Sequence, residues 1–293
     1  MNNIKDFSEM TPTEKTTWLI YTGQPDTSGQ TVGEKKVFFT ARDVGLPTMI
    51  LTTGQMTPYF NNLRDLTCIN VGTSNSFHIL VELMARKISA KIDGQKYDAI
   101  ITAAEAGETW GGAIAYTLNK SAPYMTSKVK KGLDQTDMTM TSPITGETLQ
   151  LLHIYGHVAG KKAIFLEDTV SSFKTGEVLY FSAKKAGLEV LPDTFCYFDR
   201  LQTPSGLKEK LGLKINSLID IIQFTDLGLT WGKLSKEDYD YIRLYQKDEQ
   251  SYCLDTIENN KEWFKHNEMA IKVIEYYNNN GMPNVSELLK EII

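Results

Sequence analysis

The sequence predicts an α/β fold built around a parallel sheet. Short apolar runs rich in Ile, Phe or Val, as buried strands tend to be, alternate along the chain with amphipathic or Ala-rich stretches. These runs are 98-DAIITAA, 162-KAIFLED, 189-EVLPDTFCYFD and 215-INSLIDIIQF. Alternating strands and helices imply right-handed crossovers, so the strands should lie parallel with helices on both faces. Ligands of such sheets bind beyond the carboxyl ends of the strands.

The stretches between these runs read as helices. Residues 78–92 and 110–119 carry apolar side chains at helical spacing. The segment 177-EVLYFSAKKAG does the same up to Gly187, where a C-terminal cap is expected. Each of these helices would cross from one strand to the next.

The chain divides into three parts. Residues 1–37 hold a turn-rich stretch and are expected to form a partly ordered N-terminal extension, while 38–230 form the sheet domain. Residues 231–293 are expected to be a C-terminal helical extension, because 234–250 and 256–281 are long, charged and helical in period. This extension is expected to be a packing or dimerisation element with charged outer faces.

Composition limits the function classes. The 293 residues are 41% hydrophobic, enough for one large decorated domain or two smaller ones. No run of about 18 apolar residues occurs and the polar start lacks the order of a secretory signal, so a cytoplasmic protein without a membrane partner is expected. The net charge of -5 argues against broad nucleic-acid binding.

Metal ligands are sparse in the sequence. The three cysteines form no CxxC pair, and only His153 and His157 stand at a spacing that metal ligands use. That pair lies in LLHIYGH, which reads as a strand, so we expect packing there rather than a metal site.

An acidic pair, Glu167 and Asp168, ends the second apolar run. Charge repulsion and desolvation both oppose such a pair, so the two carboxylates either reach water or hold a ligand. The hydroxyls of Ser171, Ser172 and Thr175 follow, and the next helix directs its N-terminus back toward them. Such a loop is an anion cradle suited to a phosphate monoester. A ribose 5-phosphate would bridge the two groups, since its hydroxyls donate to carboxylates.

This segment resembles the phosphoribosyl pyrophosphate (PRPP) signature of the type I phosphoribosyltransferases. The resemblance implies a parallel-sheet fold of that family and assigns the ribose hydroxyls to Glu167 and Asp168. It assigns the 5-phosphate to Ser171, Ser172, Phe173, Lys174 and Thr175. Phe173 stands where the family usually has Gly, which tolerates positive φ and close backbone approach better than Phe does.

A second segment, 51-LTTGQMTPYFNNLRDL, resembles the N-terminal hood of orotate phosphoribosyltransferases. The matching residues are Thr53, Gly54, Thr57, Pro58, Tyr59 and Phe60. A Gly turn before Thr-Pro-Tyr-Phe makes a rigid loop whose aromatic faces suit a flat base, or alternatively a hydrophobic staple. Thr52 replaces a Lys of the family and Asn61 replaces a second aromatic, so the acceptor base stays open.

The pyrophosphate side matches less closely. In 124-YMTSKVKKGLDQ, Lys128 and Lys131 keep two lysine positions of the family and Ser127 replaces an Arg; the alternative is a solvated charge run. The polar loop that follows, 132–148, suits a lid. The family's pyrophosphate loop falls on Ala104 and Glu105, where Glu105 adds negative charge.

The resemblance implies transfer of the 5-phosphoribosyl group from PRPP to a ring nitrogen of a nucleobase, with an orotate-like pyrimidine favoured. Asp168, Lys128 and Lys131 would be catalytic. The base would contact Tyr59, Phe60, Ser171 and Arg200. The stretch 197-YFDRLQ resembles the family's Val-Asp-Arg strand end, which implies that Arg200 pairs with the carboxylate of orotate. Magnesium would bind through PRPP without a direct protein ligand, and a homodimer is expected.

Two alternatives stay open. Phe173, Ser127 and Glu108 favour a non-catalytic PRPP-binding regulator of the same fold, although neither terminus is basic enough for a DNA-binding module. Thr52 and Asn61 favour a phosphoribosyltransferase for another base.

Overall fold

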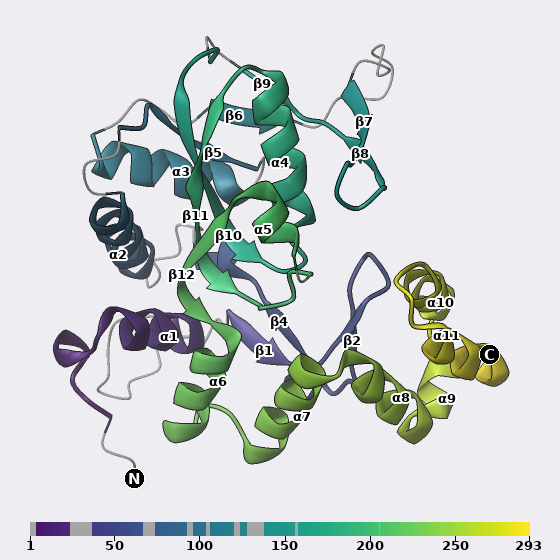
Figure 1. Cartoon of the computed structure of the whole chain (residues 1–293). Helices are drawn as coiled ribbons and strands as arrows, with labels where there is room; N and C mark the ends of the chain where they lie inside the picture. Colours follow the sequence, from purple (N-terminus) through teal and green to yellow (C-terminus); the bar gives the residue numbers. More distant parts are fainter. Residues whose placement is uncertain are drawn as a thin grey trace.

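The computed structural model describes residues 4–23, 37–66, 74–92, 96–103, 106–119, 124–127, 138–155, 158–204 and 206–293. A sheet domain with helices on both faces stands above an all-helical C-terminal part, and a small hood of short strands lies between them (Figure 1). No described helix is both long and apolar enough to cross a bilayer.

The main sheet has the strand order β12-β11-β10-β5-β6-β9. Its strands are β5 (Ala99–Thr102), β6 (Tyr124–Ser127), β9 (His153–Ile154), β10 (Lys162–Val170), β11 (Glu189–Asp199) and β12 (Lys214–Asp220). All pairs are parallel except β6 with the edge strand β9. The predicted parallel sheet is therefore confirmed, and the four apolar runs correspond to β5, β10, β11 and β12.

Helices cover both faces of this sheet. Along β10 the side chains alternate, so that Ile164 and Leu166 enter one core while Ala163 and Phe165 enter the other. The first core contains α2 (Ser74–Lys91) and α3 (Ala106–Thr117), and the second contains α4 (Lys174–Lys185) and α5 (Leu207–Leu211). Two buried faces explain why the strands are almost uniformly apolar.

An N-terminal helix, α1 (Pro12–Thr22), lies beside β12 and α6 (Ile221–Thr230) (Figure 1). Thr11 caps it in a reciprocal capping box with Glu14, and Pro12 occupies its first turn. Leu19 and Ile20 are fully buried in the first core. The sequence reading of this region as a partly ordered extension missed this helix, while the turn-rich stretch 24–36 lies outside the described residues.

The hood consists of two short antiparallel pairs. One joins β1 (Phe38–Thr40) to β4 (Tyr59–Asn61), and the other joins β2 (Met49–Ile50) to β3 (Met56–Thr57). A further hairpin, β7 (Thr139–Thr141) with β8 (Thr148–Gln150), projects beside α4. The three described 3-10 helices are η1 (Phe7–Glu9), η2 (Arg42–Val44) and η3 (Leu63–Leu66).

The C-terminal extension is helical, as predicted, but more broken. It forms α7 (Lys236–Lys247), α8 (Glu249–Asn259), α9 (Lys261–Lys265), α10 (Ala270–Asn279) and α11 (Pro283–Ile292). The first break comes at Asp248, whose side chain accepts a hydrogen bond from the Ser251 N–H and so caps α8. Pro283 is the first residue of α11, a position where proline is well tolerated.

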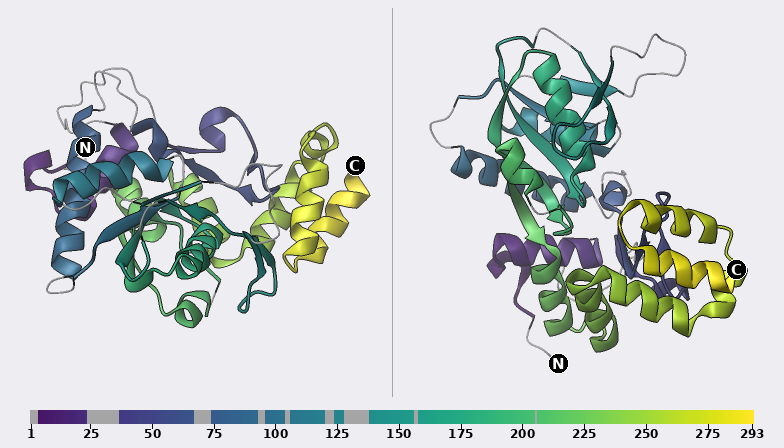
Figure 2. Two further views of the ribbon diagram at one scale, coloured as in Figure 1. Left: turned by 90° about the horizontal axis from the view of Figure 1, so that it is seen from above. Right: turned by 45° about the vertical axis from the view of Figure 1, so that its right-hand side comes forward.

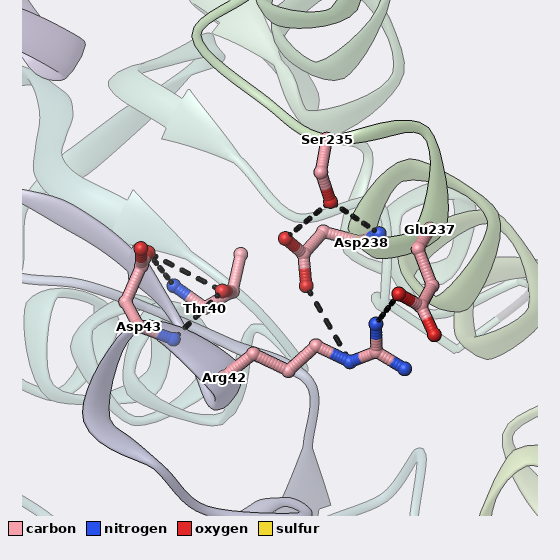
Figure 3. Close-up of polar contacts among 6 residues, drawn as sticks. All are labelled: Thr40, Arg42, Asp43, Ser235, Glu237 and Asp238. Carbon is pink, nitrogen blue, oxygen red and sulfur yellow. Dashed lines mark hydrogen bonds and ion pairs between the residues drawn. The ribbon is translucent and has the colours of Figure 1, made fainter.

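These helices pack on the hood (Figure 2). Gly54 has φ +95°, and a Cβ there would lie 2.1 Å from the Lys272 carbonyl oxygen, so only glycine allows this approach. Elsewhere on the hood, Arg42 pairs with Glu237 and its Nε lies 3.9 Å from Asp238 Oδ1 (Figure 3). We call this Arg42–Glu237–Asp238 contact the surface latch.

Candidate functional site

The acidic pair and the loop after it meet at a small cavity. β10 continues to Val170, so Glu167 and Asp168 lie within the strand, and α4 already begins at Lys174. Glu167 and residues 169–176 line a cavity of about 50 Å³. A volume of this size holds a few water-sized groups and is suited to one phosphate. The structure thus brings together Glu167, Ser171, Ser172, Phe173, Lys174 and Thr175 from the predicted set.

Phe173 keeps the backbone conformation for which the family uses glycine. It precedes α4 with φ 62° and ψ 17°, in the left-handed region. Its ring is 3% exposed and packs in the second core, so close to Gly176 that a Cβ there would lie 2.4 Å from the ring. The strain of about 1–3 kcal/mol is offset by roughly 1.5–3 kcal/mol from burying the ring.

Glu167 holds an oxygen that lacks a protein partner. The side chain is 8% exposed, and its Oε1 is buried without a hydrogen bond within the described part of the chain. Burial, followed by the nearby charge of Asp168, raises the pKa of Glu167 to about 8. Leaving such an oxygen unsatisfied costs about 1–3 kcal/mol, which a hydroxyl donated by a ligand would recover.

Asp168 projects from the opposite face of β10, because successive residues of a strand alternate. It is half-buried, and its Oδ1 accepts a hydrogen bond of 2.9 Å from the Thr169 N–H. Burial, and after it the charge of Asp168, raises the pKa of Tyr197 well above its ordinary value. The carboxylate therefore lies on the same side of the sheet as the Tyr197 and Trp110 rings, whose centroids are 4.2 Å apart.

Arg200 begins the loop after β11 and lies next to the end of β10. Its N–H donates to the Val170 carbonyl at 2.8 Å. The guanidinium is buried against the hood: Nε donates to Tyr59 Oη at 3.0 Å, and Nη2 donates to Thr57 Oγ1 at 2.9 Å. Its Cζ lies 4.6 Å from the Tyr59 ring centroid, a cation–π contact.

The predicted base-contacting residues therefore lie partly together. Tyr59 is fully buried beneath Arg200, whereas Phe60 is half-buried, with its ring 5.5 Å from that of Phe39. Ser171 contacts the loop after Arg200, since its carbonyl accepts from Thr203 Oγ1 at 3.1 Å. Stacking of a base on Tyr59 and Phe60 stays a prediction.

The predicted pyrophosphate residues are outside the described part of the chain. Ala104, Glu105, Lys128 and Lys131 all fall there, as does His157, while Glu108 lies in the first turn of α3. Within the described residues, no three His, Cys, Asp or Glu side chains gather as a metal site would require.

The β7–β8 hairpin contacts the first turn of α4 directly. Lys174 Nζ lies 3.1 Å from a carboxylate oxygen of Glu147, and Ser142 Oγ donates to Glu177 in a short hydrogen bond. The lysine predicted to bind phosphate is thus paired with a carboxylate from the polar loop that the sequence read as a lid.

Three residues near Arg200 were not singled out from the sequence. Gln246 Nε2 donates to Tyr59 Oη at 3.2 Å, Tyr245 Oη accepts from Gln55 Nε2 at 3.0 Å, and Glu249 Oε1 accepts from the same Gln55 nitrogen at 3.1 Å. They lie on α7 and α8, where the periodicity predicted helices but did not identify what the helices pack against.

Comparisons with known proteins agree with this geometry. No protein-family model matches the chain. It is 27% identical over 197 residues to the orotate phosphoribosyltransferase of Saccharolobus solfataricus, covering 65% of this chain and 85% of that protein. It is 25% identical over 144 residues to the hypoxanthine/guanine phosphoribosyltransferase of Methanotorris igneus, covering 48% of this chain and 75% of that protein.

Among solved structures, the UMP synthase of Leishmania donovani matches with a TM-score of 0.55 at 15% identity. The match covers 81% of this chain but only 42% of that longer chain. These findings confirm the fold expected from the sequence and the resemblance stated there.

Proposed function

We propose that this chain, whose fold is that of the type I phosphoribosyltransferases, transfers a 5-phosphoribosyl group from PRPP to a ring nitrogen of a nucleobase and releases pyrophosphate. The observation that carries the proposal is the phosphate-sized cavity at the end of β10, beside Glu167 Oε1, which has no hydrogen-bond partner among the described residues. A sugar phosphate suits both features, because its phosphate accepts hydrogen bonds from the loop while its hydroxyl donates to the carboxylate.

In this mechanism the bond from the ribose C1 to pyrophosphate breaks as the ring nitrogen forms its bond to C1. Positive charge develops on the ribose and negative charge on the leaving group, so catalysis is mostly positioning and electrostatics. Glu167 and Asp168 accept hydrogen bonds from the ribose hydroxyls and lie near the developing cation. The first turn of α4 and the loop before it hold the 5-phosphate.

The leaving group is assigned to residues named from the resemblance. Lys128 and Lys131 bind the pyrophosphate, with the backbone at Ala104 and Glu105. Magnesium bound to PRPP would supply positive charge that offsets the charge of the pyrophosphate. The carboxylates of the site are committed to the ribose, which fits a metal bound by substrate rather than by protein.

For the acceptor we propose an orotate-like pyrimidine. Arg200 supports it, since a largely buried guanidinium at a strand end attracts a carboxylate on the base. A homodimer remains part of this proposal through the family resemblance alone. The relative from Methanotorris igneus carries the name of a purine-base enzyme, so a second acceptor class needs testing.

The test is pyrophosphate release from PRPP and Mg²⁺ with orotate, uracil, hypoxanthine, guanine and adenine offered separately. Release with orotate supports the whole proposal, and release only with another base replaces the acceptor. Calorimetric binding of PRPP with no release for any base would establish the regulator instead. No PRPP binding at all would overturn the assignment of the cavity.

A further inference from the structure

The C-terminal helices reach the part of the site proposed to bind the acceptor base. We call this part, formed by Thr57, Tyr59 and Arg200, the acceptor side. Tyr59, which carries Arg200 on its ring, also accepts a hydrogen bond from Gln246 of α7. Tyr245 packs edge-on against Tyr59, with ring centroids 6.3 Å apart, and accepts from Gln202 Nε2 at 2.5 Å. Gln202 is two residues from Arg200. Helix α7 therefore contacts both the hood tyrosine that packs against Arg200 and the loop that carries Arg200.

Glu249 is the acidic member of this cluster. Its Oε1 accepts from Gln55 Nε2 and from Tyr277 Oη, both at 3.1 Å. Gln55 bonds Tyr245 and Glu249 through the same nitrogen, which fixes the carboxylate beside the residues that surround Arg200. Burial raises the pKa of Glu249, while the hydrogen bonds from Gln55 and Tyr277 and the charge of Arg200 act in the opposite direction.

A buried guanidinium needs a compensating negative charge. Glu249 supplies one from within the protein, and a carboxylate on the acceptor base would supply another from outside. Each of these negative charges therefore weakens the attraction between Arg200 and the other, because the two carboxylates repel one another and share one positive charge.

We propose that Glu249 is a specificity-determining residue that sets how strongly Arg200 attracts an anionic acceptor, an inference that rests on the proposed function. It acts through Arg200 and does not touch the reacting atoms. Hydrogen bonds from Gln55 and Tyr277 hold the Glu249 carboxylate in position, so the C-terminal helices form a wall of the acceptor side.

Glu249→Gln tests this cleanly, because a glutamine Oε1 still accepts from Gln55 and Tyr277 while the charge is lost. The probes are orotidine 5′-monophosphate and uridine 5′-monophosphate, which differ only in the base carboxylate. Calorimetric titration of the full chain should show the affinity ratio of the first to the second rising about three- to tenfold in the variant. PRPP affinity should stay within about twofold.

Glu237→Gln is the matched control. It makes the same substitution on α7, in the surface latch, where Glu237 pairs with Arg42 away from Arg200. Its nucleotide ratio should equal that of the wild type. An unchanged ratio in Glu249→Gln, or an equal rise in both variants, overturns the inference.

The two proposals fail in different ways. If the wild-type protein binds neither nucleotide nor PRPP, the proposed function is wrong. If it binds all three and the nucleotide affinity ratio is the same in Glu249→Gln as in the wild type, only the specificity role of Glu249 is wrong. Thermal unfolding of each variant checks that any change in affinity is not a loss of folded protein.

Discussion

At the phosphate end of the site, the lining residues come from one stretch of chain, residues 167–176, whereas at the acceptor side they come from segments far apart. Gln55 and Glu249, which bond each other there, are separated by 194 positions. The phosphate end is set by a strand end and a helix start, both local features. The acceptor side depends on tertiary packing, so it is free to vary while the phosphate end stays the same.

The largest effect is expected from Asp168→Asn, next to the phosphate end but on the other face of β10. Losing one or two charge-assisted contacts of about 1.5–3 kcal/mol should lower kcat/KM by about ten- to a hundredfold, measured as pyrophosphate release. Asp193→Asn is the control, because Asp193 lies near the start of β11 and bonds Asn216 instead. Wild-type turnover in Asp168→Asn would remove Asp168 from catalysis.

Gly176→Ala should damage the same end through packing. The new methyl would lie 2.4 Å from the Phe173 ring, and moving that ring should cost about 1–3 kcal/mol of unfolding free energy and weaken PRPP binding. Gly112→Ala on α3 has nothing within 4 Å and should be neutral or slightly stabilising. Denaturant unfolding compares the two; equal stabilities would mean that the ring relocates at no cost.

The pKa of Glu167 predicts how pH affects the phosphate end. Glu167 binds its proton more tightly in the folded protein than in an unfolded chain, so its contribution to folding is full below about pH 4.5 and is lost as pH rises through about 8. Ribose hydroxyls prefer the ionised form, so PRPP affinity should rise about fivefold from pH 7 to 8, with proton release.

Calorimetry in buffers of different ionisation enthalpy measures this proton release. Glu167→Gln should abolish the part of the pH profile that belongs to the protein, leaving only that of PRPP. Identical profiles for the two proteins would show that Glu167 is already ionised in the free protein.

The smallest effect is expected at the surface latch. Arg42→Ala removes a half-exposed ion pair and a contact 4.8 Å above the Tyr241 ring, so unfolding free energy should fall by about 1 kcal/mol or less. PRPP affinity and the nucleotide ratio should not change. A change in either quantity would mean that the surface latch is coupled to the site through the hood and α7.

The sequence was informative where neighbours in the chain are neighbours in space. The end of β10, the acidic pair and the start of α4 follow from apolar periodicity and a run of hydroxyls, and the structure brings them together. That Phe173 would keep the left-handed conformation could not be foreseen, because its strain is offset by the packing of its ring in the second core.

Packing between distant segments set the limit of prediction. The periodicity of 234–250 indicated a helix, yet no pattern tells that Gln246 reaches Tyr59. Tyr59 and Arg200 were both assigned to the base, but their direct contact depends on how the hood meets β11. Helix α1 was missed because its apolar residues form one short consecutive run, Trp18 to Tyr21, which lacks helical spacing.

The hydrogen bond from the Met56 N–H to Tyr277 Oη, 3.0 Å long, spans 221 positions. The hood is therefore synthesised early, and the Met56 N–H can form this hydrogen bond only after α10 has been synthesised. The cavity lined by Glu167 and residues 169–176 precedes α7 and α8 in the chain, so the segment proposed to hold the sugar phosphate is synthesised before the helices that surround Arg200.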